Sequence, residues 1–398
     1  MAISGLAVTF PFMNLSAAFG AGVGVGSSSY LSVKLGQRDY STAQRILGNN
    51  ITLNIIIGFM FSVVSLIFLD PILYFFGASD QTIPYAREYM IIILLGNIIT
   101  HLYFGMNAVL RAASKPRQAM YTTIFTVVLN SILDPLFIYT FDMGIRGAAI
   151  ATILSQTVAL AWQIRLFSDK GELLHLKRGI YRLDNRIVKN ILGIGISPFA
   201  MNATACLVAI FVNQRLLEYG GDLAVGAFGI ANRVAFIFIM INFGVNQGMQ
   251  PIAGYNYGAQ NYDRLMRVLK LAMIAGTCIT TSGFLVAEFI PHICVRLFTS
   301  DSELTELSVN GLRIMMAAMP IVGYQMIVTN FFQSIGKAKI SIFLSLSRQL
   351  LFLVPLIGVM PLFFGVNGVW VAMPISDSFS AIFALVMMVR YMRVFKKR

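Results

Sequence analysis

The chain consists of two copies of one module. The glycine-led pattern before Tyr40 recurs before Tyr262, and the pattern from Gly144 to Gly147 recurs from Gly365 to Gly368. Three further matches are Asp80 with Asp301, Ser114-Lys115-Pro116 with Gly336-Lys337-Ala338, and Leu133-Asp134-Pro135-Leu136 with Leu353-Val354-Pro355-Leu356. The matching residues of the two copies are about 221 positions apart throughout, which indicates a duplication. Paired modules with a cleft between them are a common plan of membrane transporters.

Both copies are too apolar for a soluble domain. Hydrophobic residues make up 57% of the chain and charged residues 12%, and the mean hydropathy is +0.75. Residues 1–33 contain no charged side chain, and a helix of about 20 apolar residues suffices to cross a bilayer. The three cysteines have neither paired spacing nor a CxxC motif, which argues against a disulfide framework or a metal site. We therefore predict an all-α, multi-pass membrane protein without a cofactor.

The net charge of +13 follows the expected membrane topology. Most of the 30 Lys and Arg residues fall in one set of alternate loops and in the C-terminal tail. This is the positive-inside pattern, so the basic loops and the C-terminus are expected to be cytoplasmic. No basic patch remains for a nucleic acid.

Apolar runs bounded by Gly, Pro and charge clusters predict eleven helices. The basic segment 168–185 is the natural cytoplasmic linker between an N-terminal bundle, 1–167, and a C-terminal bundle, 186–398. Because the basic loops match between the halves, we expect parallel repeats around a central cavity. The predicted helices are 3–33, 41–76, 82–112, 117–141, 146–167, 186–219, 223–256, 262–298, 303–333, 337–363 and 366–395.

One helix of the first repeat is missing from this sequence. Gly22, Gly26 and Gly36 align with Gly244, Gly248 and Gly258, which pairs residues 1–33 with 223–256. No segment here pairs with 186–219. We therefore expect a protein of two six-helix bundles whose first bundle has five helices here. A start codon assigned too late, or a truncated sequence, explains this better than a natural protein of eleven helices.

The sequence resembles the multidrug and toxic compound extrusion (MATE) family, in particular its bacterial multidrug-efflux branch. The matching patterns are Pro11-Phe12-Met13-Asn14, Gly36-Gln37-Arg38-Asp39-Tyr40, Arg111-Ala112-Ala113-Ser114-Lys115-Pro116, Asn130-Ser131-Ile132-Leu133-Asp134-Pro135 and Gly229-Ile230-Ala231-Asn232-Arg233. The resemblance implies two six-helix bundles that form a V around a central cavity. It also implies export of cationic, amphipathic drugs in exchange for H+ or Na+, by a protein that is a monomer.

Asp134 is the strongest candidate for the ion-coupling residue. A carboxylate inside a spanning helix costs about 2.5–3.5 kcal/mol on insertion scales, so it usually faces a cavity or a partner. Asn130 lies one turn away on the same face, and Tyr89 and Thr152 lie at similar depth in the predicted bundle. The family resemblance implies that these four residues join an aspartate of the first family helix in a protonation network. The alternative is a carboxylate that only holds helices together.

The second bundle gives a weaker signal. Arg233 and Asp377 are our preferred polar site there, with a static salt bridge as an equal alternative. Val354 stands where the first half has Asp134, so coupling is expected to be asymmetric. The span 303–333 has no central carboxylate, and H+ is therefore favoured over Na+ as the coupling ion.

Three classes of function compete. The leading one is a proton-coupled multidrug exporter that works by alternating access. A lipid-linked oligosaccharide flippase, or a flippase for another lipid, would share this wider architecture, but it would need deep Arg and Lys residues, of which only Arg233 and Arg348 are present. A membrane-embedded enzyme would need a nucleophile with its base, or a metal cluster, within the spans, and neither pattern occurs.

Overall fold

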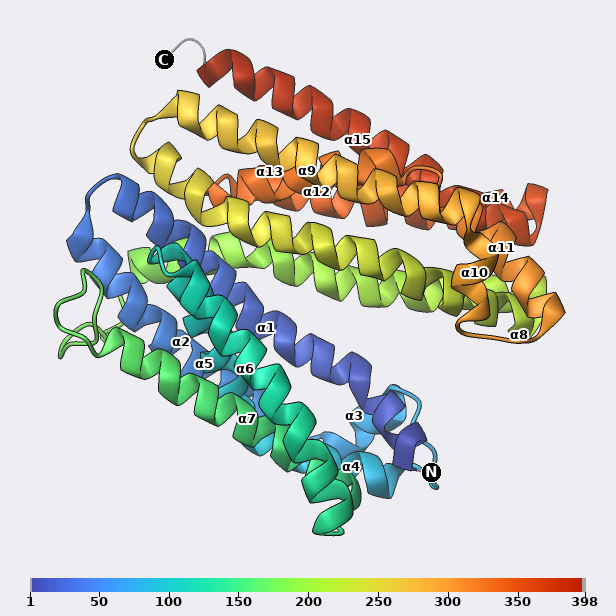
Figure 1. The fold of residues 1–398 in the computed structure, drawn as a ribbon, viewed down its shortest axis with the longest axis horizontal. Helices are drawn as coiled ribbons and strands as arrows, with labels where there is room; N and C mark the ends of the chain where they lie inside the picture. The colour runs from blue at the N-terminus through green and yellow to red at the C-terminus, as the bar shows by residue number, and fades with distance from the viewer. Residues whose placement is uncertain (1, 396–398) are drawn as a thin grey trace. The chain divides into compact units, whose positions relative to one another are not determined.

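The computed structural model describes residues 2–395, and within them the side chains of residues 9–205 and 207–392. The described chain is helical and divides into two compact units, Met1–Asn202 and Ala203–Arg398 (Figure 1). The boundary between the units lies inside one long helix. Residues 186–202, which the sequence assigns to the C-terminal bundle, therefore pack with the first unit.

The first unit is built around α1 (Ala2–Gly36), α2 (Tyr40–Ile67) and α5 (Asn97–Ala112), which pack against one another. In Figure 1 these helices lie alongside one another in blue shades. The outer elements of the unit are α3 (Leu69–Phe75), α4 (Ile83–Leu95), α6 (Pro116–Pro135), the π-helix η1 (Leu136–Thr140) and α7 (Gly144–Phe167).

The second unit begins within α8 (Asn185–Gly258). Gly221 interrupts this helix with φ 66° and ψ −167°, a conformation open to glycine, so α8 consists of two helical segments that meet at a kink. This break falls between the predicted helices 186–219 and 223–256. The remaining elements are α9 (Tyr262–Phe289), α10 (Pro291–Arg296), α11 (Ser302–Met316), α12 (Met319–Ser334), α13 (Ala338–Leu346), η2 (Ser347–Leu353), α14 (Val354–Phe364) and α15 (Val366–Phe395).

The irregular points of the two units match. The pair α4/α5 bends by 54° at Gly96, and the pair α11/α12 bends by 50° at the equivalent place. Arg38 and Gln260 both have positive φ, at 58° and 59°, in turns that lead to Asp39 and Asn261. A π-helix lies next to the proline of each repeat, after Pro135 and before Pro355. The duplication seen in the sequence is therefore present in the backbone, including its breaks.

The helices have the length and composition of membrane spans. Within the described chain, seven helical segments are long and apolar enough to cross a membrane, and the count reaches nine if each bent pair forms one span. Every one of the eleven predicted ranges coincides with a helix, a helix segment or a broken helix of residues 2–395. The protein is thus a multi-pass, all-helical membrane protein.

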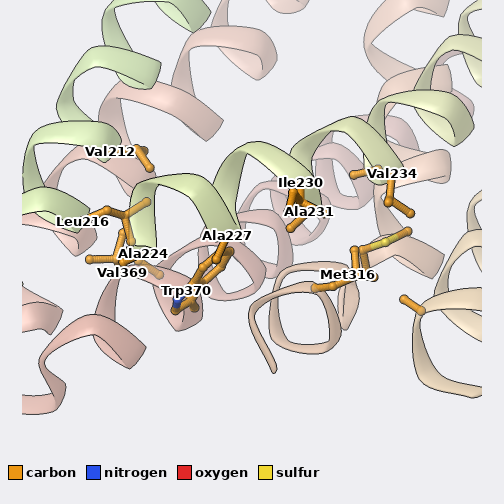
Figure 2. Close-up of a cluster of buried hydrophobic side chains, with 14 of the residues drawn as sticks. Val212, Leu216, Ala224, Ala227, Ile230, Ala231, Val234, Met316, Val369 and Trp370 are labelled. Carbon is orange, nitrogen blue, oxygen red and sulfur yellow. The ribbon is translucent and has the colours of Figure 1, made fainter. Parts of the chain in front are cut away.

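Each unit has its own apolar cores. In the second unit, the fully buried Trp370 lies under Ala224 and Ala227 of α8 (Figure 2). A Cβ atom at Gly311 would come within 2.5 Å of the Trp370 ring, so the glycine lets α11 approach α15 closely. The core of the first unit includes Leu31 of α1 and Ile46 of α2.

The linker between the bundles is packed against α2. Leu174 and Ile180 are buried, and Gln44 donates to the carbonyl of His175. Asn49 donates to the Arg182 carbonyl over 3.2 Å and accepts from the Asp184 amide over 3.0 Å. These contacts fix the basic segment to the cytoplasmic end predicted for α2.

Candidate functional site

The candidate coupling carboxylate lies where α6 changes into a π-helix. Pro135 directly follows Asp134, and because it has no amide hydrogen it cannot continue the regular hydrogen-bond ladder. The wider turn of η1 follows at once, and such π-helical turns are frequent at functional sites. Asn130 donates a hydrogen bond of 3.1 Å to Asp134 Oδ1. The predicted Asn130–Asp134 pair therefore forms within one helical turn.

Asp134 has no cationic partner among the described side chains. It is half-buried, and none of the ion pairs in that part of the chain includes it. A neutral amide is a weak partner for a carboxylate in an apolar surrounding. Such a carboxylate can take up a proton without first breaking a salt bridge.

The other two predicted members of the site are placed differently. Tyr89 on α4 is only 7% exposed, and it is near enough to Asp134 for their charges to interact. Thr152 on α7 is half-buried, and its hydroxyl donates to the carbonyl of Ala148, one turn earlier, over 3.0 Å. The structure thus relates Tyr89, Asn130 and Asp134, while the Thr152 hydroxyl serves its own helix.

A polar contact between α5 and α7, beside this site, was not predicted from the sequence. Thr100 of α5 donates a hydrogen bond of 2.5 Å to Gln156 Oε1 of α7. Gln156 lies one turn from Thr152 on the same face of α7, and this spacing could have revealed it. The contact ties α7 to α5 just beyond the bend at Gly96, where a Cβ atom would strike Ile153.

In the second unit the ionisable side chains are paired. Arg348 Nε lies 2.6 Å from Asp377 Oδ1, which joins η2 to α15. The neighbouring Ser376 hydroxyl donates to the backbone carbonyl of Arg348 over 2.7 Å. We predicted a polar site of Arg233 and Asp377, but the partner of Asp377 is Arg348, and Arg233 is exposed on α8. Packing of η2 on α15, which spacing along the sequence does not reveal, selects the partner.

An apolar groove of about 970 Å³ lies in the first unit between α1, α2 and the first segment of α8. Its lining is aromatic and aliphatic, and includes Phe12, Phe19, Phe61 and Phe199. The equivalents of groove residues Phe12 and Ser65 in the second repeat are Val234 and Ala287. Those two residues are buried in one cluster with Val208, Val212 and Leu216 of α8. The groove therefore corresponds to a surface that a helix covers in the second unit.

No group of three or more His, Cys, Asp or Glu side chains that could hold a metal ion occurs among the described residues. The site around Asp134 accordingly consists of one carboxylate with an amide on α6 and a phenol on α4. This set can bind and release a proton, and it offers no nucleophile paired with a base.

Comparison with known proteins gives a consistent result. The MatE family model matches residues 1–136 and 196–357. Multidrug export protein MepA from Staphylococcus haemolyticus (strain JCSC1435) is 27% identical over 383 residues, which cover 96% of this chain and 84% of the relative. The MepA protein of Staphylococcus aureus (strain N315) is similar to the same extent.

Two solved structures are similar along essentially the whole chain. One is the outward-facing conformation of a multidrug resistance MATE family transporter of the MOP superfamily, with a TM-score of 0.93 and 25% identity. It covers 100% of this chain, which covers 89% of that one. The other is the MATE multidrug transporter DinF-BH, with a TM-score of 0.90 and 34% identity, covering 99% of this chain and 88% of its own.

Proposed function

This chain belongs to the MatE family, and from that premise we propose that it is a multidrug exporter that exchanges cationic, amphipathic drugs for protons. The relatives with assigned roles are named multidrug export proteins, and the similar structures are multidrug transporters rather than enzymes. The basic loops favour a C-terminus in the cytoplasm, and the bacterial relatives favour the bacterial cytoplasmic (inner) membrane as the protein's location.

The observation that carries proton coupling is Asp134. Within the described spans it is a carboxylate held by a neutral partner, Asn130, whereas Asp377 is held by Arg348. Because Asp134 has no cationic partner in the described chain, a proton can neutralise it without breaking an ion pair. In an apolar surrounding that change alters how strongly the group attracts its neighbours and water. Protonation of Asp134 would therefore shift the balance between two arrangements of α6 and η1.

The helix breaks provide places where such a shift can be absorbed. A bent or broken helix leaves backbone groups outside the regular hydrogen-bond ladder at the break, and residues at the ends of helical elements commonly act as hinges. The bend at Gly96 lies between Tyr89 and Thr100, and η1 follows Asp134 directly. We propose alternating access in which protonation at Asp134 from the outside repacks α6, η1 and α4, and the drug leaves outward.

The flippase alternative loses support from the pairing of Arg348. A lipid-linked pyrophosphate would need free cationic groups within the spans, and Arg348 is held by Asp377 at 2.6 Å. Arg233, the other cation deep in the predicted spans, is exposed. A single guanidinium would neutralise little of the charge of a pyrophosphate. The apolar and aromatic character of the protein fits an amphipathic drug better.

The test is ethidium uptake into everted membrane vesicles under an imposed proton gradient. We expect uptake by the unchanged protein, loss of uptake in Asp134→Asn, and full uptake in Asp142→Asn, a matched change at an exposed loop carboxylate. Full uptake in Asp134→Asn would contradict coupling at this residue. Uptake driven only by Na+ would keep the exporter and reject the proton. No uptake under either gradient would favour a lipid substrate.

A further inference from the structure

A column of buried polar side chains runs between α1, α2 and α5 of the first unit. It does not include the residues around Asp134. Its members are at most 5% exposed and are contributed by all three helices: Ser16, Ser27, Asn50, Asn54, Asn97 and His101. Uncharged polar groups in this number are unusual in the apolar interior of a helix bundle, because each one costs free energy unless it is hydrogen-bonded.

His101 lies within the column, one turn after Asn97 on α5. Its Nε2 atom lies 3.3 Å from the Ser16 hydroxyl, which donates to Asn97 Oδ1 over 2.7 Å. The Asn97 amide in turn reaches the Gly58 carbonyl over 3.3 Å. Further neighbours of the ring include Gly20 and Phe61.

The second ring nitrogen of His101 has no hydrogen-bond partner. Nδ1 is buried and points toward α2, where a Cβ atom at Gly58 would lie 3.3 Å from it. A neutral imidazole has one donor and one acceptor nitrogen, so a ring with one nitrogen bonded and the other free can pass a proton from one side to the other.

The column continues one turn further along α2 and α5. A Cβ atom at Gly105 would strike the Asn54 amide, which shows how closely Asn54 lies against α5. Asn54 Nδ2 donates to Asn50 Oδ1 over 3.1 Å. Asn54 Oδ1, Asn50 Nδ2 and the Ser27 hydroxyl have no protein partner. Buried polar atoms of this kind are usually satisfied by ordered water.

Sequence neighbours of two column residues contact the two regions that a proton route must connect. Asn49, next to Asn50, bonds the linker at Arg182 and Asp184, on the predicted cytoplasmic side. Thr100 precedes His101 and bonds Gln156, one turn from Thr152. Consecutive residues of α5 thus contact the region of the candidate coupling site and the buried column.

We propose that this column is the route by which the coupling proton leaves for the cytoplasm, with His101 as its relay. The proposal rests on the proton exchange proposed above. In the structure the Ser16 hydrogen goes to Asn97, so Nε2 carries the ring proton and Nδ1 is the free acceptor, which is the state after a transfer. Before the transfer Ser16 donates to Nε2 and the ring proton is on Nδ1. Ser16 then passes its proton to Nε2 while it receives another, and the Nδ1 proton leaves through water at Asn54 and Asn50. The ring regains its first tautomer by rotating or by a second transfer, so that one proton enters and one leaves.

The test uses the protein in everted vesicles and compares two readouts. Ethidium counterflow exchanges drug for drug and moves no net proton, whereas proton-driven ethidium uptake requires a complete proton route. We expect His101→Gln to keep counterflow and to slow proton-driven uptake by roughly 100-fold, the low end of what a positioned proton-transfer group contributes. His175→Gln and His292→Gln change the other two histidines of the chain and should behave like the unchanged protein.

A second variant separates the route from a structural role. Asn50→Leu combined with Asn54→Leu replaces both partners of the 3.1 Å hydrogen bond and removes their unpaired buried atoms, so the protein should melt at the same or a higher temperature. We expect this stable variant to lose proton-driven uptake as His101→Gln does. Unchanged uptake in both variants would overturn the route while leaving the exporter intact. Loss of counterflow in both would also overturn it, because it would show that the column serves drug passage or folding. Absence of proton-driven uptake by the unchanged protein would instead refute the proposed function.

Discussion

Arg348 holds Asp377 across the second unit through a 2.6 Å contact, and its own carbonyl is held by Ser376. The pair is mostly buried, with the Arg348 side chain 30% exposed and the Asp377 side chain 10% exposed. It therefore ties the π-helix η2 to α15 at two points, one through side chains and one through the backbone. This arrangement agrees better with a fixed tether than with a group that must exchange partners.

The tether predicts a strong asymmetry between single and double variants. Asp377→Asn leaves the Arg348 charge uncompensated and should destabilise the protein by about 3 kcal/mol. The double variant Arg348→Met with Asp377→Leu should recover most of that loss, because no buried charge remains. Thermal unfolding in detergent measures both, and retained proton-driven uptake in the double variant would exclude a role of the pair in coupling.

The close approach of α1 to α8 makes a second prediction. A Cβ atom at Gly26 would strike the backbone carbonyl of Ile191, and that carbonyl belongs to a helix that cannot move aside. We expect Gly26→Ala to cost about 1–3 kcal/mol, as overpacking does. Gly193→Ala, on the same segment of α8 but with no atom within 4 Å of the new methyl group, should be neutral or slightly stabilising. Equal melting temperatures for the two variants would refute this contact.

The turn before α2 makes a prediction about acid stability. Burial raises the pKa of Asp39, but hydrogen bonds from Thr42, Lys34 and Ser41 outweigh it and hold the pKa at about 2, below the usual 3.8. The carboxylate form is thus favoured by folding, and its contribution should be present above pH 4 and be lost as the pH falls through about 2. The Asp39 side chain is 32% exposed, so solvent screens part of the effect.

Two substitutions of Asp39 separate its charge from its capping role. Asp39 caps α2 through the Thr42 amide, as Asn261 caps α9 through the Arg264 amide. Asp39→Asn should therefore keep the cap and lose the acid-dependent part, whereas Asp39→Ala should cost about 1 kcal/mol at every pH. Melting temperatures at pH 7 and pH 3 measure both effects, and an acid dependence that persists in Asp39→Asn would assign it to another group.

The packed linker predicts a change in protease sensitivity. Asn49→Ala removes the bonds to Arg182 and Asp184 and should free the basic segment. Trypsin should then cut faster at the exposed Lys177, Arg178 and Arg182. Asn190→Ala is the control, because Asn190 is exposed and bonds only the Arg186 carbonyl of its own helix. An unchanged cleavage rate in Asn49→Ala would mean that the apolar contacts of Leu174 and Ile180 alone hold the linker.

The helices could be predicted from the sequence because each is a long apolar run that ends at glycine, proline or charge. The predicted break before residue 223 lies at Gly221, where the backbone takes a conformation that favours glycine. The bend at Gly96 was not predicted, since the apolar pattern of residues 82–112 continues through it. A bend does not alter the apolar composition of the run, so it leaves no signal there. It depends on the residue that packs beside it, which is Ile153 here.

The candidate site was predictable where it depends on one helix. Asn130 and Asp134 are four residues apart, and helical geometry alone brings them together. The neighbours of Asp377 and Thr100 come from other helices, so they depend on the rotation of one helix against the next. The helical periodicity of a sequence does not give the rotation of one helix relative to another. For this reason the sequence did not identify Arg348, rather than Arg233, as the partner of Asp377.

The matched breaks also order events in the history of this gene. A bend, a turn or a π-helix that occupies the same place in both units was present in the single ancestral module before it was duplicated. When the two repeats are aligned, Asp134 is equivalent to Val354, and Arg348 and Asp377 are equivalent to uncharged residues. The charged residues of the two repeats therefore diverged after the duplication. Both copies thus kept the bends and π-helices of the ancestral module. The first copy has the titratable Asp134, and the second has the Arg348–Asp377 ion pair.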